Sequence, residues 1–72
     1  MACNLIINKK GTDDYLVDGY QTEEAAKSAL QDLLKQIADA GTNKSKVIVT
    51  KSGMVALPIS EFASAKIYRS GG

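Results

Sequence analysis

Residues 22–41 read TEEAAKSALQDLLKQIADAG, and their apolar side chains recur at spacings of three and four positions. This spacing is typical of an amphipathic α-helix, because residues three or four apart lie on the same helix face. That face would consist of Ala26, Ala29, Leu30, Leu33, Ile37 and Ala40, and Leu34 would broaden it. We therefore expect one long helix that packs this face on other parts of the molecule.

Both ends of the segment carry the signals of helix termini. The hydroxyl of Thr22 can accept one of the free backbone N–H groups at the start of a helix. Glu23 and Glu24 follow it, where the positive end of the helix dipole favours carboxylates. Gly41 fits the position just after a helix, because glycine readily adopts positive φ.

Short runs rich in β-branched and other apolar residues lie on both sides of the predicted helix. Residues 3–8 and 14–20 precede it, separated by a turn that contains Gly11, which favours a β-hairpin. Residues 46–50 and 54–57 follow it and predict a second hairpin. The expected fold class is α+β, with a single amphipathic helix packed on a four- to five-stranded, mainly antiparallel sheet.

The core of this fold is predicted from the apolar faces of its elements. Residues 3–8 alternate, so that Cys3, Leu5 and Ile7 share a face that can be buried. The contacts expected across the core join Leu30, Leu33 and Ile37 of the helix to Ile7, Val17 and Val49 of the strands.

Residues 60–69 fit two alternatives. Residues 65–69 read as a fifth short strand, after one helical turn at residues 60–63 with Ser60 as its N-cap. The alternative is a helical face, which would consist of Ile59, Phe62, Ala63 and Ile67.

The composition fits one small domain over residues 1–70, followed by a flexible tail at residues 71–72. The chain has 72 residues, of which 44% are hydrophobic and 24% are charged. It contains no histidine, the commonest general base, and one cysteine, Cys3, which excludes a Cys-rich zinc site. We therefore expect no enzymatic activity, no cofactor and no metal.

The start of the chain shows no basic leader followed by an apolar segment, and no apolar run approaches the ~20 residues of a membrane-spanning helix. We expect a cytoplasmic protein that does not enter a membrane. A core this small is marginally stable, which favours a homodimer or a tight partner complex.

Charge is unevenly distributed along the chain. Residues 1–42 hold four basic and seven acidic side chains, whereas residues 43–72 hold five basic side chains and one acidic side chain. The five cations are Lys44, Lys46, Lys51, Lys66 and Arg69. If they meet in the fold, they form a binding surface for phosphates or for an acidic partner. The alternative is that they are ordinary solvated residues.

The aromatic side chains offer a second functional hypothesis. Tyr15, Tyr20, Phe62 and Tyr68 are the only aromatic residues. Aromatic rings on a sheet surface stack bases or anchor a protein partner, and otherwise they complete a core. Tyr68 lies between Lys66 and Arg69 in the sequence, so we include it among the candidate binding residues.

The sequence ends in Gly71-Gly72, after a predicted strand. This ending and the order of elements resemble ubiquitin-like and sulfur-carrier proteins of the β-grasp fold. The resemblance implies a carrier in which Gly72 is adenylated or thiolated by an activating enzyme.

Residues 49–58, VTKSGMVALP, resemble the hairpin of AbrB-like swapped-hairpin regulators, in which a glycine turn precedes a Val-x-x-Pro strand. This resemblance implies a small DNA-binding dimer.

The function expected from the residues themselves is a small non-enzymatic interaction or regulatory module, bacterial or phage-like in size. It would bind another macromolecule. A protein partner is favoured over nucleic acid, because the acidic first half of the chain would repel a phosphate backbone.

Overall fold

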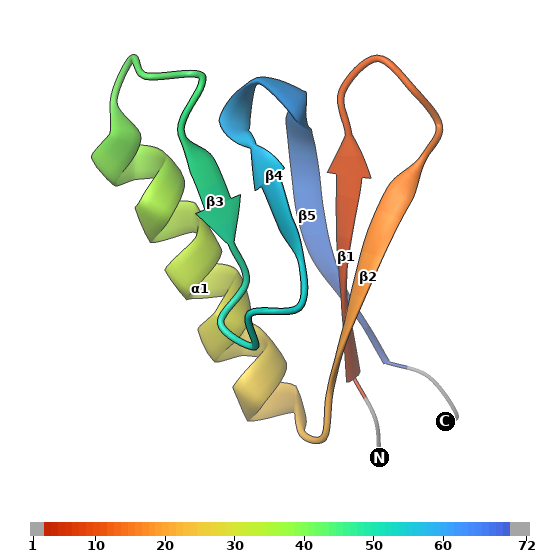
Figure 1. Cartoon of the computed structure of the whole chain (residues 1–72). Helices are drawn as coiled ribbons and strands as arrows, with labels where there is room; N and C mark the ends of the chain where they lie inside the picture. Colours follow the sequence, from red (N-terminus) through yellow and green to blue (C-terminus); the bar gives the residue numbers. More distant parts are fainter. Residues whose placement is uncertain (1–2, 70–72) are drawn as a thin grey trace.

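The computed structural model describes residues 3–69, in which five strands and one long helix follow one another in the expected order (Figure 1). The elements are β1 (Cys3–Lys9), β2 (Tyr15–Tyr20), α1 (Glu23–Ala40), β3 (Val47–Val49), β4 (Ala56–Pro58), the 3₁₀-helix η1 (Ile59–Glu61) and β5 (Phe62–Arg69). The predicted α+β class, with a single helix packed on antiparallel strands, is confirmed.

The strands form two sheets. In the larger sheet β1 lies in the centre, and it pairs antiparallel with β2 on one side and with β5 on the other. β3 and β4 form a separate two-stranded hairpin. β4 ends at Pro58, which has no N–H to donate, and η1 then redirects the chain before β5 begins. β5 therefore joins β1 instead of extending the hairpin.

The helix termini are those that the sequence predicted. Thr22 is the N-cap, and its Oγ1 accepts a hydrogen bond of 3.1 Å from the backbone N–H of Ala25. Gly41 ends the helix with φ 60°, and its N–H donates to the carbonyl of Ala38. In the first turn, Glu23 forms an ion pair of 2.9 Å with Lys27.

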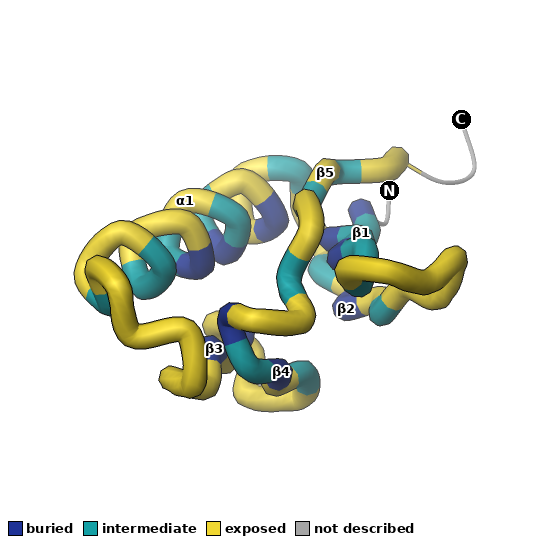
Figure 2. Tube along the Cα trace, turned by 90° about the horizontal axis from the view of Figure 1, so that it is seen from above, coloured by how far each residue is buried: buried dark blue, intermediate teal, exposed yellow. Residues whose placement is uncertain are grey.

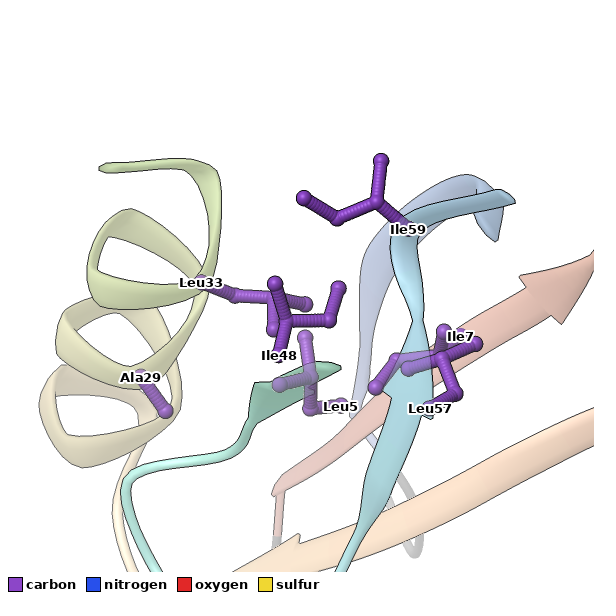
Figure 3. Close-up of a cluster of buried hydrophobic side chains, with 7 residues drawn as sticks. All are labelled: Leu5, Ile7, Ala29, Leu33, Ile48, Leu57 and Ile59. Carbon is purple, nitrogen blue, oxygen red and sulfur yellow. The ribbon is translucent and has the colours of Figure 1, made fainter. Parts of the chain in front are cut away.

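The core lies between the β2–β1–β5 sheet on one side and α1 with the β3–β4 hairpin on the other. Figure 2 shows α1 and the hairpin on the same side of that sheet, with the buried residues facing inwards. The cluster drawn in Figure 3 consists of Leu5, Ile7, Ala29, Leu33, Ile48, Leu57 and Ile59. The predicted burial of Leu33 and Ile7 is confirmed, and Leu30 and Ile37 pack against the cluster while half-buried.

Two of the predicted core contacts are wrong. Val17 is 47% exposed and Val49 is 39% exposed. The register pairs Val17 with Ile6, on the sheet face that α1 does not cover. In β3, Ile48 points into the core, and its neighbour Val49 therefore points out.

Residues 60–69 are mostly strand. The predicted fifth strand is confirmed and begins earlier than expected, at Phe62. The alternative of a helical face through this part is wrong. Ser60 does not cap a helical turn, because it lies inside η1, whose N-cap is Pro58.

Candidate functional site

One face of the β2–β1–β5 sheet has nothing packed on it within residues 3–69 (Figure 2). We call it the open face. The strand registers place nine residues there, namely Asn4, Ile6 and Asn8 of β1, Tyr15, Val17 and Gly19 of β2, and Ser64, Lys66 and Tyr68 of β5. They alternate with the buried residues of the same strands, because successive side chains of a strand point to opposite faces.

A hollow of about 350 Å³ lies in the open face. Its lining residues come from all three strands: Ile6, Asn8, Tyr15, Lys66 and Tyr68. Tyr15 and Tyr68 belong to the two outer strands, and they are 59% and 56% exposed. Ile6 belongs to the central strand, directly opposite Lys66. The central strand thus contributes the apolar Ile6 and the polar Asn8 to the hollow, and the two outer strands contribute the tyrosines.

The polar groups of the open face can donate hydrogen bonds and carry positive charge. Lys66 is its only charged side chain, and no carboxylate stands at any of its nine positions. The amide of Asn8 donates a hydrogen bond of 3.1 Å to the hydroxyl of Ser64. Chemically, the face offers apolar contact around one ammonium group.

The candidate residues Lys66 and Tyr68 meet on the open face, but the other predicted binding residues lie elsewhere. Lys44 and Lys46 belong to the loop between α1 and β3, and their carbonyls accept hydrogen bonds from the N–H groups of Ser60 and Ile59.

The two remaining cations contact the helix. Lys51 donates a hydrogen bond of 2.9 Å from Nζ to the hydroxyl of Ser28. Arg69 forms an ion pair of 3.0 Å with Glu23. Hydrogen bonding to Lys27 and the charge of Arg69 together lower the pKa of Glu23 below its usual value. Lys51 and Arg69 are therefore held by α1, and the five cations do not gather in one patch.

The positions of the carrier hypothesis, Gly71 and Gly72, lie outside the described residues. The hairpin of the other resemblance is present as β3 and β4, and Gly53 in its turn has φ 80°.

A buried carboxylate joins the two sheets. Asp18 of β2 is 4% exposed and faces the core side. Its Oδ2 accepts hydrogen bonds of 2.6 Å from the Tyr20 hydroxyl and 2.7 Å from the Ser52 hydroxyl, which belongs to the β3–β4 turn. Burial raises the pKa of Asp18, but hydrogen bonds from Tyr20, Ser52 and Thr50 outweigh this effect, so that the pKa lies below its usual value.

Sequence reasoning overlooked Ile6 and Asn8 and did not connect Tyr15 with Tyr68. The alternation of residues 3–8 already separated Ile6 and Asn8 from the buried face, and this was the available signal.

In the described part of the chain, no three His, Cys, Asp or Glu side chains lie together as a metal site would require. In the same part, no helix is long and apolar enough to cross a membrane.

Comparisons of this chain with models of protein families, with curated proteins and with solved structures found no match.

Proposed function

We propose that this chain is a non-enzymatic binding module whose open face docks a protein partner. The observation that carries the proposal is the exposure of Tyr15 and Tyr68, which line one hollow, and of Val17 on the same open face. Large apolar side chains on a free sheet face lose contact with water when a partner covers them, and this favours association. Tyrosine is also among the residues that contribute most to binding in protein interfaces.

The chemistry of the face defines the kind of partner. Lys66 is the single charged group of the open face, and Ile6 lies opposite it. A complementary partner surface would present apolar side chains to Tyr15 and Tyr68 and a carboxylate to Lys66. Such a pair of charges would mainly fix the orientation of the complex and speed its formation.

Single-stranded nucleic acid is the second candidate ligand. Two exposed tyrosine rings beside an ammonium group could stack bases and contact a phosphate, as in other single-strand-binding surfaces. Such surfaces also need a positively charged groove along the backbone of the ligand. Lys51 and Arg69 contact α1 instead of the open face, and this favours the protein partner.

A cytoplasmic site of action fits the thiol of Cys3, which is free and buried. Free thiols persist in the reducing cytoplasm, whereas secreted proteins of this size tend to form disulfides.

The experiment compares the wild-type chain with Tyr68→Ala as bait in a nuclease-treated bacterial lysate. Met54→Ala is the matched control, because Met54 is 82% exposed but lies in the β3–β4 turn. We expect a specific protein that wild type and Met54→Ala retain and that Tyr68→Ala loses. Equal retention by all three baits would contradict the proposal.

A second arm measures binding to random single-stranded DNA and RNA at low salt. Binding that Tyr68→Ala and Lys66→Glu each remove, and that weakens steeply with salt, would make nucleic acid the ligand of the open face.

A further inference from the structure

The outer edge of β2 is a free strand edge beside the open face. The N–H of Lys9 donates to the carbonyl of Asp14. In an antiparallel ladder, hydrogen-bonded pairs alternate with pairs that are not hydrogen-bonded. Leu16, Asp18 and Tyr20 therefore direct their backbone groups towards β1, and Tyr15, Val17 and Gly19 direct theirs away from it. Within residues 3–69, no side chain forms a hydrogen bond with the backbone of these three residues.

The other strand edges of the molecule are protected, and β2 is the exception among the described strands. On β3, the side chain of Gln36 hydrogen-bonds to the carbonyl and the N–H of Val49, which point away from β4. β4 contains Pro58, and β5 carries the exposed cations Lys66 and Arg69. Proline and lysine on an edge are the usual means by which proteins prevent strands of two molecules from pairing.

β2 has none of these features. Its sequence, Tyr-Leu-Val-Asp-Gly-Tyr, contains no lysine, arginine or proline. Its single charged side chain, Asp18, is buried, and its carboxylate accepts hydrogen bonds from Tyr20 and Ser52. Asp18 therefore does not prevent another strand from pairing with this edge. Figures 1 and 2 show β2 as the outermost strand of its sheet.

We propose that the β2 edge binds a second copy of this chain, so that the two β2 strands pair antiparallel about a twofold axis at Val17. In this register Val17 lies opposite the partner's Val17, and Tyr15 lies opposite the partner's Gly19. The three residues of each β2 strand whose backbone groups point away from β1 are Tyr15, Val17 and Gly19. In this register all three pair with the partner in one ladder, and no other twofold register pairs all three.

The side chains of β2 complement one another in this register. Gly19 has no side chain to cover the face at its position, where a Cβ would make only an ordinary van der Waals contact with Asn4 Oδ1 at 3.5 Å. Tyr15 is 59% exposed and would lay its ring across the partner's Gly19, an arrangement that compensates for glycine at sheet edges. The two Val17 side chains would form a β-branched cross-strand pair.

The dimer would also enlarge the open face. Strand spacing and rise give one three-stranded face an area of roughly 300 Å². Stable protein interfaces bury about 800 Å² on each partner. A twofold axis perpendicular to the sheet puts both open faces on the same side, so that one continuous surface of roughly 600 Å² results. The self-association does not depend on the ligand proposed for that surface.

Sedimentation equilibrium of the whole chain at high micromolar concentration tests this pairing. We expect the dimer mass for wild type, and an increase of about tenfold or more in the dimer dissociation constant for Val17→Lys, which places like charges directly opposite each other. Val47→Lys is the matched control, because Val47 is 52% exposed on β3, and it should remain dimeric. A monomeric wild type, or equal effects of the two variants, would overturn the proposal.

Crosslinking gives an answer even where Val17→Lys fails to fold, which circular dichroism would reveal. Under mild oxidation Val17→Cys should form a reducible covalent dimer, because paired Cα atoms in such a ladder lie about 5.5 Å apart. Cys3 is 1% exposed and does not compete. If Val17→Cys crosslinks no faster than Val47→Cys, β2 does not pair with its copy. Neither readout involves a ligand, so a failure here leaves the test of partner docking on Tyr68 intact.

Discussion

The side-chain amide of Gln36 hydrogen-bonds to both backbone polar groups of Val49. Nε2 donates to the Val49 carbonyl at 2.7 Å, and Oε1 accepts from the Val49 N–H at 3.1 Å. Nε2 also donates to Asp32, one turn earlier in α1, at 2.9 Å. The helix thus supplies, through one side chain, the hydrogen bonds that a neighbouring strand would otherwise provide to β3.

Gln36→Ala should lower the free energy of unfolding by about 1 kcal/mol, because water can reach the exposed groups of Val49 and replace part of the loss. Lys35→Ala, at the neighbouring exposed position, should stay within about 0.5 kcal/mol of wild type. Urea denaturation measures both. Amide hydrogen exchange at Val49 should also accelerate in Gln36→Ala, and an unchanged rate would contradict this role.

Leu33→Ala should cost about 2–5 kcal/mol of unfolding free energy, because Leu33 is fully buried at the centre of the cluster in Figure 3. Leu34→Ala is the control, since Leu34 is adjacent in the sequence and 48% exposed. Its cost should be about 0.5 kcal/mol or less. Similar denaturation midpoints for the two variants would show that α1 does not pack in this orientation.

Asp18 should make stability depend on pH under acidic conditions. The pKa of its carboxyl in the folded chain lies below the usual value of 3.8. The stabilisation is therefore complete well above pH 3.8, and it is lost as the pH falls below that value towards the folded pKa.

Asp18→Asn should be less stable than wild type at neutral pH by about 1–3 kcal/mol, because the amide leaves hydroxyl partners poorly satisfied. The difference should shrink as the pH is lowered through the acidic range. Thermal denaturation at several pH values measures it. A constant difference would mean that the carboxylate of Asp18 does not carry the effect.

Deletion of Gly71 and Gly72 should leave folding and partner binding unchanged, because the proposed surface is made by β1, β2 and β5. The carrier hypothesis requires the opposite, since the carboxylate of Gly72 would react with an activating enzyme. Retention of the partner by the truncated chain, together with wild-type function in cells, would exclude the carrier hypothesis. Loss of function without loss of folding would support it.

The sequence was sufficient to predict the helix and the strands, but it was insufficient to predict which side chains of β2 are buried. Thr22 and Gly41 could be placed because helix termini depend on nearby residues. In β2, the apolar Val17 was expected in the core, and no prediction buried Asp18. The structure instead exposes Val17 and buries Asp18, because the hydroxyls of Tyr20 and Ser52 satisfy the Asp18 carboxylate in the core. Ser52 is 34 positions away, and no local pattern predicts that contact.

Predicting the candidate site would have required the register between distant strands, even more than predicting the faces of β2. Ile6, Tyr15 and Lys66 meet because β1 pairs with β2 and with β5, and the second pairing joins opposite ends of the described chain. Periodicity assigns a residue to one of two faces but not to a neighbour on another strand. Lys66 and Tyr68 were identified from charge and aromatic character, whereas the hollow between them and Tyr15 required the three-dimensional structure.

The central position of β1 has a consequence during protein synthesis. β1 is the first of the described strands to leave the ribosome, but its register partners in β5, from Phe62 to Arg69, are among the last described residues to follow. Until then β1 has only β2 beside it, and a two-stranded hairpin is at best marginally stable in water. Leu5 and Ile7 thus remain without the complete core while the residues between β1 and β5 are being made, and the native sheet can close only once β5 has emerged.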